Sequence, residues 1–240
     1  MRLWRLLISL ELSLGLLVLL CVGMAAGSFS LSGEYAASIN GMPLFTWLRE
    51  TPPSISWWLW LTIVLLALLA LNTVLCSSET LWSRWGKSGM TALLAPQLMH
   101  AGFLLIVIAH LLSAVGSSLD RVEVGEMNLA ALPDGSTFGI ASISVQTSPE
   151  GMPIGFSGEL VADLNKPDER VIISPNHPWF SKGFGVYIKQ AEAYPVKRAL
   201  LEIHREPGAS MALAGSLLFM AGNVLLVAIR SKRQDSQIDS

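Results

Sequence analysis

Four long apolar runs constrain this chain more than any other feature of its sequence. They cover residues 6–27, 57–76, 92–115 and 209–229, and the second and fourth carry no charged residue. About 20 apolar residues are needed for a helix to cross the hydrocarbon core of a bilayer. Only 14% of the residues are charged, against about 25% in soluble domains. The sequence therefore predicts an integral membrane protein with four transmembrane helices.

The first run has a second interpretation, a cleaved signal peptide. Arg2 and Arg5 form a basic start, and small residues occur at 25–27. The run is longer than the 7 to 15 apolar residues of a usual signal core, which favours a retained helix. Four retained helices place both ends of the chain on one side of the membrane.

Basic residues predict which side that is. Arg2 and Arg5 precede the first run, Arg84 and Lys87 follow the second, and three more basic residues follow the fourth. These positions all fall on one face, which the positive-inside rule makes cytoplasmic. We therefore expect this order: helix 1 in 1–27, an outer segment 28–56, helix 2 at 57–76, an inner loop 77–91, helix 3 at 92–115, an outer domain 116–208, helix 4 at 209–229 and an inner tail 230–240. A short helix is expected within the outer segment, around 44–49.

The segment between the third and fourth runs has a different composition. Apolar and polar residues alternate with period two in five stretches, at 138–145, 158–164, 170–174, 185–189 and 199–204. Such spacing predicts a small antiparallel sheet, as a sandwich or an open barrel. No cysteine lies in this segment, so it has no disulfide. The expected fold class is an integral membrane α+β protein with a β-rich extracytoplasmic domain between helices 3 and 4.

Ionisable residues inside the expected spans are functional candidates, because they are costly to bury in a membrane. Glu11, His100 and His110 qualify. Glu11 either has a function or faces water near the interface. His100 is either an axial ligand of haem iron or another metal, or an interhelical hydrogen-bonding group. His110 lies about 15 Å further along the helix and points about 80° away, so the two histidines cannot bind one iron.

The other candidates carry weaker signals. Asn72 and Cys76 share a helix face and are expected to pack or to form hydrogen bonds, and Cys21 is expected to be a small buried apolar residue. His177 and His204 are expected in the outer domain as satisfied surface or sheet residues. The sequence contains no Cys-x-x-Cys, Walker loop, Gly-x-Ser-x-Gly or His-Glu-x-x-His motif, and each of these would have indicated a specific chemistry.

Several stretches, in this order, resemble the ResB (CcsB) family of System II cytochrome c biogenesis. The stretch around the first run begins with Trp4-Arg5-Leu-Leu-Ile-Ser-Leu-Glu-Leu-Ser and ends in Ala26-Gly-Ser-Phe29. The second contains Ser56-Trp-Trp-Leu59 and Leu71-Asn-Thr-Val-Leu-Cys76, and the third contains His100-Ala-Gly-Phe-Leu-Leu-Ile106. The outer segment contains Asn176-His-Pro-Trp179 followed by Lys182-Gly-Phe184. The chain departs from the family in its shorter outer domain and in the residues around Ser9–Glu11.

The resemblance implies a role in the export and attachment of haem. Members of the family act with ResC (CcsA), a membrane protein with haem-binding histidines, and present reduced haem to the Cys-x-x-Cys-His motif of apocytochrome c. A histidine of the third helix pairs with a histidine of that partner to hold haem b near the cytoplasmic side. By its position in the stretch, that residue is His100, whereas His110 matches no family position and is expected to be a packing group.

The sequence thus predicts a ResB-like subunit in a bacterial inner (cytoplasmic) membrane, with both termini cytoplasmic and the β domain periplasmic. Its partners would be a ResC/CcsA-like membrane protein, apocytochrome c and haem. No residue offers a general acid or base, so the expected catalytic set is empty and the chain is a non-catalytic subunit of a haem-lyase-type complex. Two alternatives are a scaffold that never contacts haem and a membrane-anchored sensor whose β domain binds a ligand.

Overall fold

A computed structural model describes residues 2–86, 89–149 and 153–238 of the chain. Lys87, one of the basic residues that predict the cytoplasmic side, lies outside these residues. The last two residues of the expected tail also lie outside them. The chain forms two compact units. One holds the long helices, and the other comprises residues 40–43 and 116–207.

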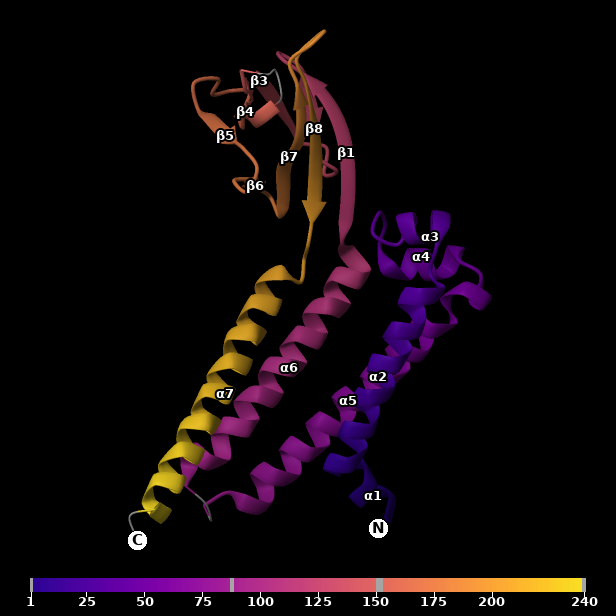
Figure 1. Ribbon diagram of the computed structural model, residues 1–240, viewed down its shortest axis with the longest axis vertical. Helices are drawn as coiled ribbons and strands as arrows, with labels where there is room; N and C mark the ends of the chain where they lie inside the picture. The colour runs from indigo at the N-terminus through magenta and orange to yellow at the C-terminus, as the bar shows by residue number, and fades with distance from the viewer. Residues whose placement is uncertain (1, 87–88, 150–152, 239–240) are drawn as a thin grey trace. The chain divides into compact units, whose positions relative to one another are not determined.

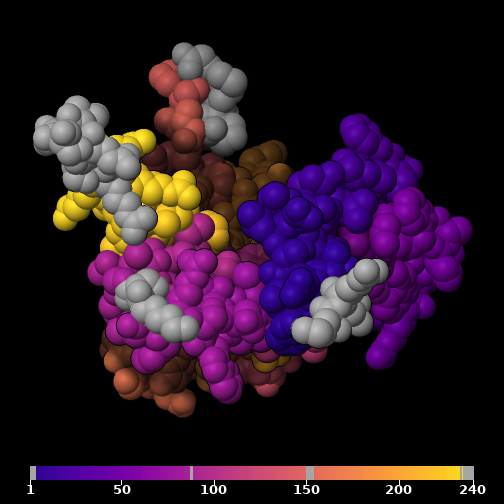
Figure 2. Space-filling view, turned by 90° about the horizontal axis from the view of Figure 1, so that it is seen from below, coloured from indigo at the N-terminus to yellow at the C-terminus, as the bar shows by residue number. Residues whose placement is uncertain are grey.

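The second, third and fourth apolar runs are single helices that extend beyond their runs, and most of the first run is helical as well. Four helices of the described chain are long and apolar enough to cross a membrane: α2 (Leu10–Ser30), α5 (Pro53–Arg84), α6 (Met90–Gly116) and α7 (Ala209–Ile238). α5 has 32 residues and α7 has 30, so α7 includes most of the segment that was expected to be a tail. The ends of α5 and α7 and the start of α6 lie at the same end of the helical unit as the N-terminus (Figure 1). Figure 2 looks onto this end.

The first apolar run is not one helix. α1 (Arg2–Leu7) ends and α2 begins at Leu10, with Ser9 as its N-cap. The Ser9 hydroxyl accepts from the Leu12 amide at 3.1 Å, which satisfies one of the free N–H groups of the new helix. The Asn72 side chain of α5 donates to the carbonyl oxygens of Leu7 and Ser9, at 2.7 and 3.3 Å. Asn72 is therefore a hydrogen-bonding group, as expected, and it stabilises the break.

α2 and α5 pack antiparallel along their length. The contacts run from Ser13, which donates to Asn72 Oδ1 at 2.8 Å, through an apolar cluster of Leu16, Leu65 and Leu69. Gly23 lies against Thr62 further along, and the Trp58 ring covers Gly27, where a Cβ atom would overlap it. Gly23 and Gly27 form a Gly-x-x-x-Gly pattern, which lets neighbouring membrane helices approach closely.

α6 and α7 form a second antiparallel pair built on small residues seven positions apart. Gly222 lies against Ala95 and Met99, Gly215 against Gly102, and Gly208 against Ala109. A Cβ atom on Gly215 would lie 2.8 Å from the Gly102 carbonyl oxygen and 3.0 Å from the Ile106 nitrogen. The two backbones therefore touch, which fixes both the register and the rotation of α6 against α7.

The segment between α2 and α5 contains two short helices, α3 (Gly33–Ser38) and α4 (Leu44–Glu50). A helix near Leu44 was expected, whereas α3 was not. Trp47 of α4 is 1% exposed and its indole N–H donates to the Ser38 hydroxyl at 3.1 Å, which ties the two helices together.

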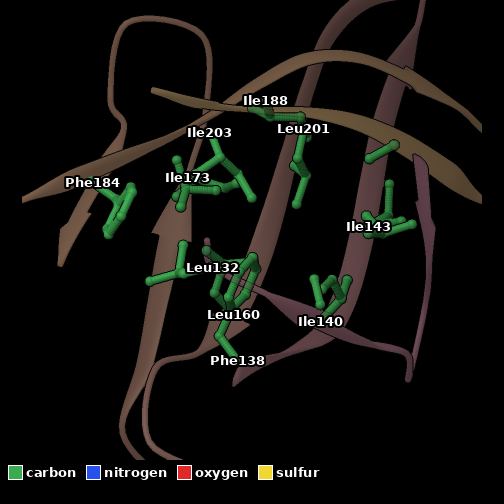
Figure 3. Close-up of a cluster of buried hydrophobic side chains, with 14 residues drawn as sticks. Leu132, Phe138, Ile140, Ile143, Leu160, Ile173, Phe184, Ile188, Leu201 and Ile203 are labelled. Atoms are coloured by element: carbon green, nitrogen blue, oxygen red, sulfur yellow. The ribbon is translucent and has the colours of Figure 1, made fainter. Parts of the chain in front are cut away.

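The second unit is a sandwich of two four-stranded antiparallel sheets. One sheet has the order β1-β8-β7-β6 and the other β2-β3-β4-β5. The strands are β1 (Ser118–Gly125), β2 (Leu129–Ala131), β3 (Thr137–Thr147), β4 (Pro153–Val161), β5 (Arg170–Ile173), β6 (Trp179–Ser181), β7 (Phe184–Glu192) and β8 (Arg198–Arg205). Figure 3 shows buried side chains of both sheets meeting in one core, among them Phe138, Ile143, Leu160 and Leu201. The prediction of a small antiparallel β unit is confirmed, although three short or polar strands, β1, β2 and β6, were missed.

The motif at residues 174–184 builds two tight turns. Ser174 and His177 exchange backbone hydrogen bonds at 3.2 and 2.9 Å, with Pro175 and Asn176 between them and Asn176 at φ 70°. Proline followed by an asparagine with positive φ is typical of a type II turn. Lys182 and Gly183, at φ 51° and 83°, join β6 to β7 as a type I′ turn. The Trp179 ring lies 5.5 Å from the Phe138 ring, so this motif has a structural explanation in the β unit.

One buried carboxylate stabilises the outer face of the first sheet. Glu202 of β8 is 7% exposed and contacts Arg121 of β1 at 2.9 Å, Lys189 of β7 at 3.2 Å and His204 of β8 at 3.2 Å. Burial raises the pKa of Glu202, but hydrogen bonds from His204, Arg121 and Lys189 outweigh it and hold this pKa at about 2. The ionised carboxylate therefore belongs to the folded state.

This carboxylate predicts acid sensitivity of the β unit. Because the pKa is lower in the folded state, its stabilisation is complete above about pH 4.5 and is lost as the pH falls towards 2. Glu202→Gln should destabilise the β unit at pH 7 by about 1–3 kcal/mol, and the difference from wild type should shrink below pH 4.5. Thermal unfolding followed by the β signal in circular dichroism at pH 7, 5 and 3 measures this. Glu192→Gln, on an exposed side chain of β7, is the control, and equal pH profiles for the two variants would contradict the assignment.

Candidate functional site

His100 occupies the part of α6 where this helix faces α5. Its Nδ1 lies 2.7 Å from the hydroxyl of Ser77 on α5, and the imidazole is half-buried. Ser77 precedes the end of α5 at Arg84 by seven residues, and His100 follows the start of α6 at Met90 by ten. These ends of α5 and α6 lie at the end of the helical unit that carries the N-terminus (Figure 1). Ser77 was not singled out from the sequence, because only the rotation of two helices brings it to His100.

The glycine contact with α7 explains why His100 points to α5. Gly102 fixes the face of α6 that touches α7, and His100 lies about 160° around the helix from Gly102. The imidazole therefore points away from α7. Gly102, which has no side chain, and the imidazole of His100 thus lie on nearly opposite faces of the same helix.

The Ser77 contact leaves one ring nitrogen free for a ligand. When Nδ1–H donates to the Ser77 hydroxyl, the lone pair of the imidazole is on Nε2, the arrangement in which a protein histidine binds a metal. No group of three His, Cys, Asp or Glu side chains that could hold a metal ion occurs among the described residues. The described part of the chain thus offers one oriented imidazole and not a complete ligand set.

His110 lies elsewhere on α6 and differs from the expectation. Its side chain is exposed and has no hydrogen bond to any described residue. The interpretation of His110 as a packing group within this chain is therefore wrong. The physical reason is that, among the described residues, neither α7 nor the α2–α5 pair covers this side chain.

Glu11 lies at the helix break rather than one or two turns inside a continuous helix. It is exposed and belongs to the first turn of α2. A carboxylate at the first turn of a helix interacts favourably with the helix dipole. This position accounts for Glu11 without a ligand or a catalytic role.

The two outer histidines are in the β unit. His177 is an exposed turn residue, whereas His204 contacts Glu202 and has its ring centroid 4.9 Å from that of Tyr187. Both match the expectation of surface or sheet residues. Cys76 is half-buried and Cys21 is exposed, and both are free thiols. Cys21 therefore does not have the buried position that was expected.

If the chain were a sensor whose β unit binds a ligand, a hollow of this unit would have to hold that ligand. One hollow of about 630 Å³ lies beside β1 and the β7–β8 turn. Its charged side chains are already paired, Lys197 with Glu126 at 2.8 Å and Arg198 with Glu123 at 3.0 Å. This hollow therefore offers no unpaired charge to a ligand.

Fold and composition together define the class, an α+β membrane protein with four candidate spans and a β sandwich between the third and the fourth. No family model matches the chain, and no curated protein matches it. Among solved structures it is similar to "Cytochrome c Heme Lyase CcmF", with 13% identity, a TM-score of 0.44 and coverage of 91% of this chain and 34% of that one. The chain thus spans about a third of the length of that protein. At this TM-score the likeness does not define a family, and the ResB resemblance stays a prediction.

Proposed function

We propose that the chain is a haem-handling subunit of a cytochrome c maturation complex, similar to ResB of System II. It would work with a ResC/CcsA-like membrane protein to carry haem outward and attach it to apocytochrome c. The proposal includes a bacterial inner membrane, both termini in the cytoplasm and the β sandwich outside. The sequence stretches that resemble ResB support the family, and the basic residues at the helix ends support the orientation.

The observation that carries the proposal is the orientation of His100 by Ser77. The 2.7 Å contact directs one ring nitrogen to a hydroxyl and leaves Nε2 for an iron atom. A half-buried imidazole whose ring is oriented by a hydroxyl fits an axial ligand of haem b. His100 would hold the haem iron from this chain, and its imidazole would help to set the redox potential of the iron.

The second axial ligand would come from the partner. His110 is about 15 Å along the helix from His100 and lies about 80° around it, and the remaining two histidines are in the other unit. A histidine of a ResC/CcsA-like protein would complete the site. This chain would then hold and orient haem at the contact with its partner, with no residue of its own in the thioether-forming chemistry.

A deletion and complementation experiment tests the function as a whole. A strain that lacks this chain should lose covalently bound haem from its c-type cytochromes, measured by haem staining of denatured membrane proteins on a gel. The full chain supplied from a plasmid should restore the stain. Normal staining without the chain would reject a role in cytochrome c maturation. A loss that His100→Ala complements fully would instead favour the scaffold alternative.

A further inference from the structure

The side of α6 that carries His110 is covered by α2 and α5 at Phe103 and is exposed at His110. Around the helix, Phe103 lies about 100° and His110 about 80° from Gly102, so both are on one side. Phe103 packs against the cluster of Leu16, Leu65 and Leu69 from α2 and α5. His110, two turns further on, is exposed. The cover that α2 and α5 provide therefore ends between these two residues, in line with the divergence of α6 from α5 in Figure 1.

This side differs from the side of α6 that suits lipid. Ile108, Leu112 and Val115 are exposed and lie about 220–280° from Gly102. In this last part of α6, the side chains on that side of the helix are all apolar, which suits contact with the acyl chains of lipid. His110 points in a different direction, towards the space beside the α2–α5 pair.

An imidazole at this depth requires a polar partner. His110 precedes the end of α6 at Gly116 by six residues, about 9 Å along the axis. The apolar residues Leu111, Leu112, Ala114 and Val115 follow it, and the hydroxyl of Ser113 among them accepts a hydrogen bond from the Gly208 amide at 3.3 Å. Histidine lacks the long aliphatic stem with which lysine and arginine reach the interface. Ionisable side chains in spans face protein or water and bind a partner group, yet no described residue of this chain bonds to His110.

We infer that this side of α6, defined by Val107, His110 and Ala114, binds a transmembrane helix of a different protein that offers a hydrogen-bonding side chain to His110. The occupant is a helix because only helices and closed barrels satisfy their own backbone polar groups inside hydrocarbon. It is a polar-bearing helix because the exposed group is an imidazole in apolar surroundings. The inference rests on exposure and depth and does not require haem at His100.

Photo-crosslinking in native membranes tests it. Ala114, about 40° around the helix from His110 and one turn above it, is replaced by p-benzoylphenylalanine in the full chain expressed in its own host. Leu112, on the lipid side, receives the same residue as the control. We expect a protein adduct from position 114 whose cross-linked peptide, by mass spectrometry, belongs to a polar-bearing transmembrane segment of another protein. Position 112 should give no such adduct.

Variants at His110 then measure the hydrogen bond. His110→Leu should lower the yield of the position-114 adduct roughly three- to fifteenfold, the range for one interhelical hydrogen bond, whereas His110→Gln should keep it within about twofold. Adducts with lipid alone, a cross-linked peptide from a second copy of this chain, or equal yields in all three backgrounds would overturn the inference. Loss of bound haem in His110→Leu at an unchanged yield would also overturn it and would assign His110 to haem. The adduct should persist in His100→Ala. This result would show that the helix contact at His110 does not depend on the proposed haem site at His100.

Discussion

The complex purified with its partner should lose its haem absorption when His100 is replaced by alanine. Removal of the imidazole would delete one of the two axial ligands that we propose, and the other histidine of α6, His110, lies about 15 Å further along the helix. The expected result is the disappearance of the split α and β bands of a bis-histidine haem in His100→Ala, with recovery on addition of imidazole. Absorption spectra of wild type and variant, normalised to protein, measure it.

Two further variants make this prediction specific. His177→Ala removes an exposed imidazole from a turn of the β unit and should leave the spectrum unchanged. Ser77→Ala removes the hydroxyl that lies 2.7 Å from Nδ1 of His100, and loss of such an orienting group costs about 10–100-fold in metal affinity. Ser77→Ala should therefore bind haem more weakly without abolishing binding. An unchanged spectrum in His100→Ala would assign both ligands to the partner and leave this chain as a scaffold.

Replacement of Gly215 by leucine should separate α6 from α7. Any Cβ at this position lies 2.8 Å from the Gly102 carbonyl oxygen and 3.0 Å from the Ile106 nitrogen. Both are backbone atoms of a helix and cannot move aside alone. Insertion of side-chain atoms into tight packing usually costs about 1–3 kcal/mol, and we expect Gly215→Leu at or above the upper end. The melting temperature of the detergent-purified protein measures the loss.

A neighbouring position on α7 provides the matched control. Ala214 is exposed, so Ala214→Leu adds a larger side chain to the same helix without a backbone collision. Its melting temperature should stay close to that of wild type. Because α7 fixes the rotation of α6, Gly215→Leu should also weaken the proposed haem binding at His100, whereas Ala214→Leu should not. Equal melting temperatures for the two variants would contradict the α6–α7 contact.

The sequence contains a signal for part of this α6–α7 contact, the regular spacing of small residues. Gly208, Gly215 and Gly222 are seven residues apart, and Ala95, Gly102 and Ala109 have the same spacing on α6. Small residues at regular intervals in apolar runs are typical of close helix packing. The sequence does not show which two stripes meet, because every run contains small residues and the register depends on both helices at once.

The sequence by itself determined the four spans and most of the longer strands. Length and apolar character suffice for a span, because a helix must cover a fixed thickness of hydrocarbon, and period-two alternation follows from the geometry of a strand. The tertiary structure decided the rest. The break before Leu10 depends on Asn72, which lies more than 60 residues away, and the orientation of His100 depends on Ser77 of another helix. The exposure of His110 depends on where α2 and α5 cease to cover α6. These features require the relative rotation, register and divergence of helices, which arise from contacts between distant segments and leave no local pattern in the chain.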